Sequence, residues 1–180
     1  GHFSFIQSVH LTLSQPISCA HPFRMLYLGG KEVCIMRLNH DCIREALICI
    51  EEHTGIRTSC VFIDAGPEGF AVAEALGKPL EIPEYQIQLI EKFGNDQLLY
   101  HVQYCIEANL AKGDLAGDRI IIADLTPTGH ELLAKIRDPE RWPKVKKGMA
   151  AVRDYSIAAL GSVAEGMTSA AINALSFGQM

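Results

Sequence analysis

The stretch that decides the fold reads Arg119-Ile-Ile-Ile-Ala-Asp-Leu-Thr-Pro-Thr-Gly-His-Glu-Leu-Leu-Ala-Lys-Ile-Arg137. Its apolar run at 120–122 is short and β-branched, which favours a strand. Thr126 followed by Pro127 is typical of a helix start: the hydroxyl caps the helix, and the proline stands where an N–H is not needed. Apolar residues then recur at helical spacing up to Ile136. The stretch therefore predicts a strand that leads directly into a capped amphipathic helix.

The segments around this stretch complete the predicted domain. Helices are expected at 39–53, capped by Asn39, at 67–76 and at 95–108, and strands at 60–63 and 119–124. Residues 81–93 fit either a strand or a short helix. Asn109 stands where a residue tolerant of positive φ is wanted. A strand that passes through Leu-Thr-Pro-x-Gly into a helix is how many winged-helix domains leave their wing. We therefore predict an α+β, mostly helical fold with a winged-helix-like core and a C-terminal helical tail.

Three segments are expected along the chain. Residues 1–35 lack the basic start and continuous apolar run of a signal peptide, and Gly1-His2 resembles a cloning remnant. We expect an N-terminal extension, from a tag or an upstream start, that packs on the domain or pairs with an edge strand. Residues 36–138 form the winged-helix-like domain. In it the 95–108 helix packs on the 39–53 helix, and 119–124 pairs in a hairpin. Residues 139–180 form a basic linker and a C-terminal helix.

Charge is distributed unevenly along the chain. With 180 residues and 48% hydrophobic composition, the chain can bury a core, and its net charge of −5 argues against a general affinity for nucleic acid. Residues 36–112 hold 6 Lys/Arg and 12 Asp/Glu, whereas residues 135–153 hold 7 Lys/Arg and 2 Asp/Glu. An anionic partner is therefore expected to meet the segment 135–153.

No motif predicts a catalytic or metal centre. The six cysteines, at 19, 34, 42, 49, 60 and 105, form no C-x-x-C pair and no zinc framework. We expect reduced structural thiols and a cytoplasmic location. His101 and His130 lack a carboxylate or nucleophile that would complete a catalytic set. The sequence therefore predicts no cofactor, no metal and no enzymatic activity.

Five segments resemble a known family, and each is quoted by its bounds: Met36–Leu47, Leu99–Val102, Glu107–Leu110, Leu125–Leu133 and Ile136–Lys146. The spacing of Gly-His-Glu and of Arg-Asp to Trp142 is fairly specific. Over about 36–180 the chain resembles a domain-of-unknown-function family of bacterial, prophage and phage proteins with a winged-helix-like arrangement. It departs from the family in a longer stretch at 60–95 and in Asn109, where the family usually has glycine. The resemblance implies a fold, but no activity, cofactor or catalytic residue.

The helix at 95–111 would enter the major groove in a DNA-reading winged helix. With Val102 as the buried centre, its outward face is predicted to hold Gln97, Tyr100, Tyr104 and Glu107. That face has no Lys or Arg, so phosphates would repel it, and we interpret it as partner-facing. If DNA binds, the contacts are expected from the basic residues elsewhere, namely Arg119, Arg141, Lys144, Lys146 and Lys147. We interpret Trp142, the only tryptophan, as an anchor for the C-terminal helix.

The C-terminal helix near 153–177 repeats small residues every fourth position, at Ala158, Ser162, Gly166, Ala170 and Ala174. Such a row lets a neighbouring backbone approach closely. An apolar stripe beside the row, from Ile157 to Leu175, needs a cover in water. Glu165 and several serines weigh against a membrane span. The cover is either the chain's own domain or a second copy. We predict a homo-oligomer, because the domain before Pro143 is expected to close its own core.

Two functions are carried forward. The first is a non-enzymatic winged-helix binding protein that acts as a DNA-linked regulator in a phage or prophage setting. The alternative is a protein–protein interaction module that self-associates through its C-terminal helix and does not bind DNA directly.

Overall fold

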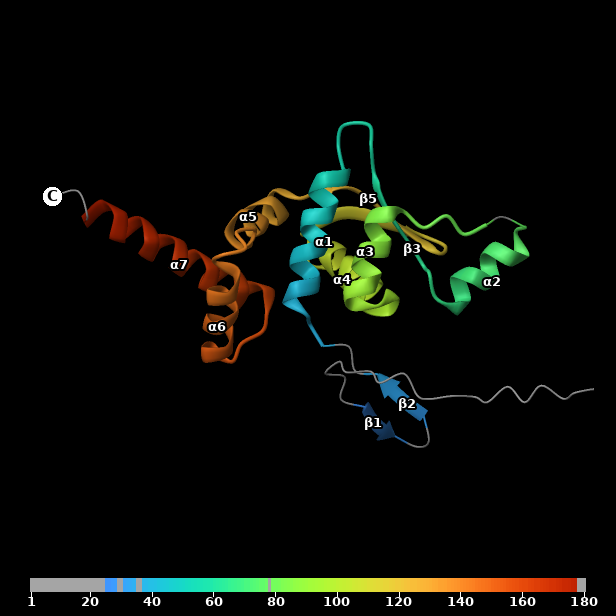
Figure 1. Ribbon diagram of the computed structural model, residues 1–180, viewed down its shortest axis with the longest axis horizontal. Helices are drawn as coiled ribbons and strands as arrows, with labels where there is room; N and C mark the ends of the chain where they lie inside the picture. Colours follow the sequence, from blue (N-terminus) through green and yellow to red (C-terminus); the bar gives the residue numbers. More distant parts are fainter. Residues whose placement is uncertain (1–24, 29–30, 35–36, 78, 178–180) are drawn as a thin grey trace, which may run out of the picture. The chain divides into compact units, whose positions relative to one another are not determined.

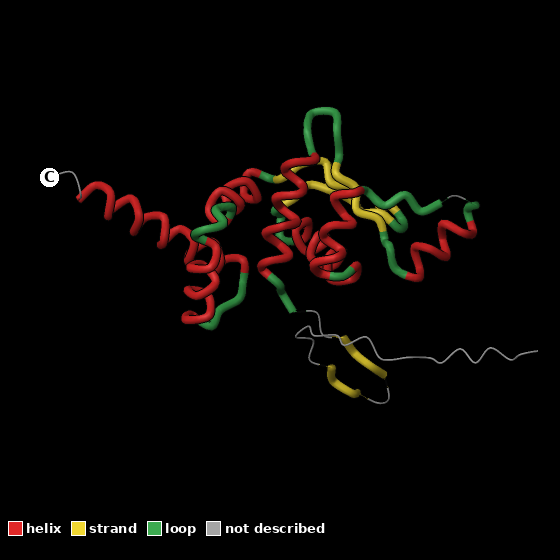
Figure 2. Tube along the Cα trace, viewed as in Figure 1, coloured by secondary structure: helices red, strands yellow, loops and turns green. Residues whose placement is uncertain are grey.

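The computed structural model describes residues 25–28, 31–34, 37–77 and 79–177 (Figures 1 and 2). The chain separates into two compact units, 1–35 and 36–180. In the first unit, β1 (Met25–Leu28) and β2 (Lys31–Cys34) form an antiparallel hairpin. Gly1-His2 lies outside the described residues, and the predicted packing of 1–35 on the domain stays a prediction.

The described part of the second unit holds seven helices and one three-stranded sheet. The helices are α1 (His40–His53), α2 (Pro67–Ala75), α3 (Glu84–Phe93), α4 (Asn95–Glu107), α5 (Pro127–Ile136), α6 (Trp142–Val152) and α7 (Ile157–Phe177), and the strands are β3 (Cys60–Ile63), β4 (Ala111–Ala116) and β5 (Arg119–Leu125). The predicted α+β, mostly helical class is confirmed.

Helix α1 lies at the centre of the core. Asn39 caps it as predicted: its side-chain oxygen accepts hydrogen bonds from the backbone N–H groups of Asp41 and Cys42. The residues that α1 buries recur on several sides of the helix: Cys42, Ile43, Arg44, Ala46, Leu47, Cys49 and Ile50. Helices α3, α4 and α5 and strand β5 all pack against it. The predicted packing of the 95–108 helix on the 39–53 helix is therefore confirmed.

The sheet has the strand order β3-β5-β4, and both pairs are antiparallel. Strands β4 and β5 form the predicted hairpin, joined by a two-residue turn in which Gly117 adopts φ +65°. In β5, Ile120 and Ile122 are buried and alternate with exposed residues, so one sheet face covers α1 and α4.

The outer edge of β3 is closed by side chains of α3 instead of a further strand. The Tyr85 hydroxyl accepts from Val61 N and donates to Val61 O, at 2.9 and 2.7 Å. The buried Gln86 side chain does the same at Ile63, accepting from N at 2.9 Å and donating to O at 2.5 Å. These bonds satisfy backbone groups that an edge strand would otherwise leave open. The ambiguous segment 81–93 thus contains a helix, between Pro83 and Gly94.

Residues 139–180, predicted to be a linker and tail, share the core of residues 36–138. Val145 and Met149 of α6 and Leu160 of α7 are buried in the same apolar cluster as α1. Trp142 is buried, and its Nε1 donates to Asp41 Oδ1 at 2.6 Å. The predicted role of this tryptophan as an anchor agrees with its position, and the 36–180 segment is a single compact unit.

Thr126 fixes the junction between the end of α4 and the start of α5. Its N–H donates to Leu110 O at 2.9 Å, and its hydroxyl donates to Asn109 O at 2.6 Å. The same hydroxyl accepts from Gly129 N at 3.0 Å, which is the predicted cap. Asn109 adopts φ +55°, the predicted left-handed conformation. A Cβ at Gly129 would lie 1.9 Å from Leu110 O, so only glycine lets α5 start this close to α4.

Gly129→Ala tests this junction. Because the added methyl would meet a backbone oxygen that cannot rotate away, the variant should lose about 1–3 kcal/mol of unfolding free energy or more, measured by urea denaturation. Gly166→Ala is the matched control: nothing lies within 4 Å of its added Cβ, and alanine should gain up to about 1 kcal/mol in a helix. Equal stability of the Gly129→Ala variant and the native chain would contradict the claim that this junction requires glycine.

Candidate interaction surfaces

Helices α3 and α4 follow one another directly and are joined by Gly94, which adopts φ +82°. On the outward side of α4, Tyr100 is 37% exposed and Glu107 is exposed, as predicted, whereas Tyr104 is half-buried. Asp96, in the first turn of the helix, is exposed as well. No Lys or Arg stands anywhere in α4. The exposed face of this helix is therefore acidic and aromatic.

Gln97 does not belong to the outward face, and that part of the prediction is wrong. The residue is only 9% exposed, because the first turn of α4 packs against α1. Its backbone oxygen accepts from the thiol of Cys42 at 4.0 Å and from Nδ1 of His101 at 2.6 Å. Its side-chain Oε1 is buried without a hydrogen-bond partner among the described residues.

The five predicted phosphate-binding residues do not form one basic surface. Arg119 lies beside the β4–β5 turn and α6 carries the lysines, and Figure 1 shows this turn and α6 on opposite sides of α1. Three of the five make internal ion pairs: Arg119 with Asp118 at 3.7 Å, Arg141 with Asp138 at 2.9 Å and Lys146 with Asp41 at 3.0 Å. Lys144 and Lys147 are exposed and make no ion pair with any described residue.

Asp41 joins Trp142 and Lys146 to the start of α1. Partial burial of the carboxylate raises its pKa, but hydrogen bonds from Trp142 and Lys146 outweigh that effect and leave the pKa of Asp41 below its ordinary value. Lys146 also lies over the Trp142 ring, 5.8 Å from the ring centroid. The ammonium group of Lys146 is therefore engaged within the fold and is less available to a phosphate.

The apolar stripe of α7 is covered by its own domain as far as Met167, and its later side chains lie outside the described residues. Leu160 and Ala164 are buried, and Ile157, Val163 and Met167 pack against the core beside α5 and α6. The premise that the domain closes without α7 is therefore wrong, since α6 and α7 complete it. The predicted row of small residues stays exposed at Ala158, Ser162, Gly166 and Ala170. The side chain of Ala174 lies outside the described residues.

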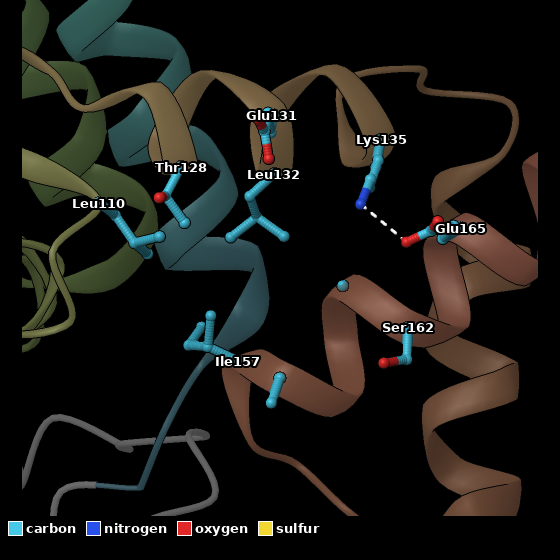
Figure 3. A pocket seen from close by; sticks show the side chains of 10 residues that line it. Leu110, Thr128, Glu131, Leu132, Lys135, Ile157, Ser162 and Glu165 are labelled. Atoms are coloured by element: carbon cyan, nitrogen blue, oxygen red, sulfur yellow. Dashed lines mark hydrogen bonds and ion pairs between the residues drawn. The ribbon is translucent and has the colours of Figure 1, made fainter.

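A groove of about 280 Å³ runs between α5 and α7 (Figure 3). Leu132 of α5 and Ile157 of α7 point into it, with Leu110 at one end. Lys135 and Glu165 form an ion pair across it at 2.9 Å. The groove is open because α7 turns Ala158, Gly161 and Ser162 towards it, so part of the small-residue row forms one wall. Its apolar floor and charged rim suit an apolar side chain of a protein partner.

The two histidines considered for acid–base chemistry have different surroundings. His101 is fully buried: its Nε2 accepts from Asn39 N at 2.8 Å and its Nδ1 donates to Gln97 O. This ring therefore ties α4 to the start of α1 as a neutral imidazole. His130 is half-exposed, with Nδ1 3.4 Å from a Glu51 oxygen and Nε2 3.8 Å from an Asp124 oxygen. Two carboxylates, one from α1 and one from β5, therefore lie near His130, and the sequence did not predict either neighbour.

The cysteines of the second unit are small core residues. Cys42, Cys49, Cys60 and Cys105 are free and buried. Burial raises the pKa of Cys105 to about 12, which opposes thiolate formation. Among the described residues, no cluster of His, Cys, Asp and Glu could hold a metal ion. Within the same residues, no helix is both long enough and apolar enough to cross a membrane. The cytoplasmic location stays a prediction.

The groove between α5 and α7 and the closure of β3 by Tyr85 and Gln86 were not predicted from the sequence, and neither were strand β4 and helix α6. The signal for the groove was the pair Ala158 and Ser162, part of the row that the sequence analysis interprets as a contact surface. The sequence gives no signal for the closure of β3, because a helix that substitutes for a strand depends on tertiary packing.

The stability of the fold should depend on pH through His101. Burial lowers the pKa of His101 from its ordinary 6.5, more than hydrogen bonds to backbone oxygens of Gln97 and Arg37 raise it. The unfolded chain therefore binds this proton at a higher pH than the folded chain. The contribution of His101 to the free energy of unfolding is therefore complete above its pKa in the unfolded chain. It is lost as the pH falls through its pKa in the folded chain.

His101→Gln retains an acceptor for the Asn39 N–H but cannot be protonated. Its urea midpoint should therefore fall less than that of the native chain between pH 8 and pH 5. Parallel decreases for the two proteins would show that another group sets the pH dependence.

Comparison with known proteins supplies a family. The sequence model of a family of hypothetical proteins, DUF2513, matches residues 37–154. No curated protein matches the chain, and neither does any solved structure. The match covers more than half of the chain and includes all the elements from α1 to α6. The chain therefore belongs to the DUF2513 family, as the resemblance to a domain of unknown function predicted.

Proposed function

We propose that residues 36–138 form a winged-helix domain that serves as a non-enzymatic protein-binding module. The order of elements supports the winged-helix assignment: helix α1, strand β3, the pair α3–α4 and the hairpin β4–β5, with β3 paired to β5. Helix α2 is inserted after β3, within the stretch at 60–95 that is longer than the family pattern. A helix-turn-helix pair presents its second helix to a partner, and here that helix is α4.

The observation that carries the proposal is the charge of α4. Its exposed side chains include Asp96, Tyr100 and Glu107, and the helix has no Lys or Arg. Carboxylates in the major groove would face the phosphates and be repelled. An arginine-rich protein segment would instead be attracted, because guanidinium groups pair with carboxylates and stack on a tyrosine ring. The proposed partner is therefore a protein segment rich in arginine.

The test uses a fluorescein-labelled peptide of nine arginines, with binding measured by fluorescence anisotropy at low salt. Replacing Asp96 and Glu107 with lysine and Tyr100 with alanine should weaken binding by roughly tenfold or more, since a single close charge pair already contributes on this scale. Because the substituted side chains are exposed, the variant should keep its fold. Circular dichroism would check this.

A matched control separates this face from the overall negative charge. Glu74→Lys combined with Glu140→Lys changes the net charge by the same amount at exposed positions outside α4. Measured at the same salt concentration, this control should bind the peptide within about threefold of the native affinity. Equal losses in the two variants would mean that the peptide senses net charge, and the proposed face would be rejected.

A DNA-linked regulator is the second candidate, supported by Lys144 and Lys147. Both are exposed on α6 and neither is neutralised by a described residue. Lys146 and Arg141 are engaged in ion pairs within the fold, so DNA contacts would depend on Lys144 and Lys147. With so few phosphate contacts, the affinity for DNA should fall only gradually as the salt concentration rises. The phage or prophage setting belongs to this candidate.

Duplex DNA of mixed sequence, tested by mobility shift at 50 mM salt, decides the second candidate. If it is correct, Lys144→Glu with Lys147→Glu should abolish the shift, whereas Lys92→Glu, at a lysine paired with Glu45 on α1, should preserve it. If no shift occurs with the native chain, this candidate is excluded.

Self-association is the third part of the proposal. The exposed row Ala158, Ser162, Gly166 and Ala170 supports a close contact between two copies of α7. The apolar stripe gives no support as far as Met167, since the domain itself covers that part. Gly166→Leu would block a contact through the row, because nothing fills the space above Gly166 in the single chain.

A further inference from the structure

The two edges of the sheet are treated differently. The outer edge of β3 is closed by hydrogen bonds from Tyr85 and Gln86. The outer edge of β4 has no such closure: among the described residues, β4 pairs only with β5. Strand β4 is six residues long, and most of its residues are exposed. An open edge of this length is a template for a further strand.

The hairpin turn determines which backbone groups of β4 face outward. In a hairpin with a two-residue turn, the pair that flanks the turn is hydrogen-bonded, here Ala116 and Arg119. Alternation then leaves the N–H and C=O groups of Leu115 and Gly113 directed away from β5. At the register shift the extra residue, Ala123, stands on β5, so β4 itself remains regular.

The sequence of β4 is complementary to itself. In an antiparallel pair of two β4 strands with a two-fold axis at Gly113, the two Gly113 residues exchange both backbone hydrogen bonds. Lys112 of each copy then stands opposite Asp114 of the other, in the closer type of pair. Both side chains are exposed in the single chain and make no ion pair with a described residue. Leu115, 57% exposed, would stand opposite Ala111 of the other copy, whose side chain is buried in its own domain.

We propose that the chain dimerises through β4, edge to edge across a two-fold axis at Gly113, so that two three-stranded sheets become one six-stranded sheet. The inference rests on the proposed self-association and names a different interface from the row on α7. A second copy fits this edge, because Lys112 of each copy would pair with Asp114 of the other.

The test is a charge swap followed by sedimentation velocity of the full chain from 10 to 300 µM. Lys112→Asp places two carboxylates opposite each other at both ends of the pair, and Asp114→Lys places two ammonium groups there. Each single variant should weaken dimerisation by roughly tenfold or more. The double variant Lys112→Asp/Asp114→Lys restores the complementary pairs and should return the dimer affinity to within about threefold of the native chain.

Gly166→Leu distinguishes the two interfaces. It should leave a β4 dimer unchanged, so a dimer that is lost in the single swaps, restored in the double swap and retained in Gly166→Leu establishes the edge pairing. A dimer that responds to Gly166→Leu and ignores the swaps overturns the inference and supports α7. If the native chain is a monomer across the whole concentration range, both the inference and the proposed self-association are wrong.

Discussion

The arrangement of the domain depends on the contact between Gly129 and the carbonyl oxygen of Leu110. Because glycine has no Cβ, the first turn of α5 can lie directly on the end of α4, where Thr126 bonds to both segments. That start directs Leu132, Leu133 and Ile136 of α5 into the core beside α1. Buried Arg44 of α1 then donates to the carbonyl oxygens of Ile136 and Arg137 at the other end of α5. Both ends of α5 are thus fixed, and α6 and α7 pack onto a surface that is already defined.

The same packing determines what remains available to a partner. One side of α4 is used to hold α1, through Leu98, His101 and Val102, and the other side exposes carboxylates and Tyr100. The basic segment after α5 loses much of its charge to neighbours, since Asp41 and Asp138 pair with Lys146 and Arg141. The net charge of the segment 135–153 does not show that Lys146 pairs with Asp41, which lies 105 residues earlier in the chain. A protein partner agrees better with the exposed surface than a phosphate backbone does.

The sequence predicted the elements that carry strong local signals. Thr126-Pro127, Asn39 and Asn109 occupy the capping and left-handed positions that their chemistry favours, and the hairpin pairs as expected. The errors arose where tertiary contacts decide. Gln97 was assigned outward from helical spacing alone, but its turn packs on α1. The cover of the apolar stripe of α7 was assigned to a second copy because nothing in the sequence shows that α5 and α6 lie beside this helix. The closure of β3 by a tyrosine and a glutamine depends on which helix lies at that edge.

Amide chemical shifts of the isotope-labelled full chain, recorded by NMR during titration with the nine-arginine peptide, test the central claim most directly. If α4 is the partner face, the shifts should concentrate at exposed positions of residues 95–107 and at the turn around Gly94, and they should saturate. The amides of α6 and of the β4 edge should change little. Shifts spread evenly over the acidic residues of the whole surface, or absent from α4, would contradict the assignment of the second helix of the pair as the binding face.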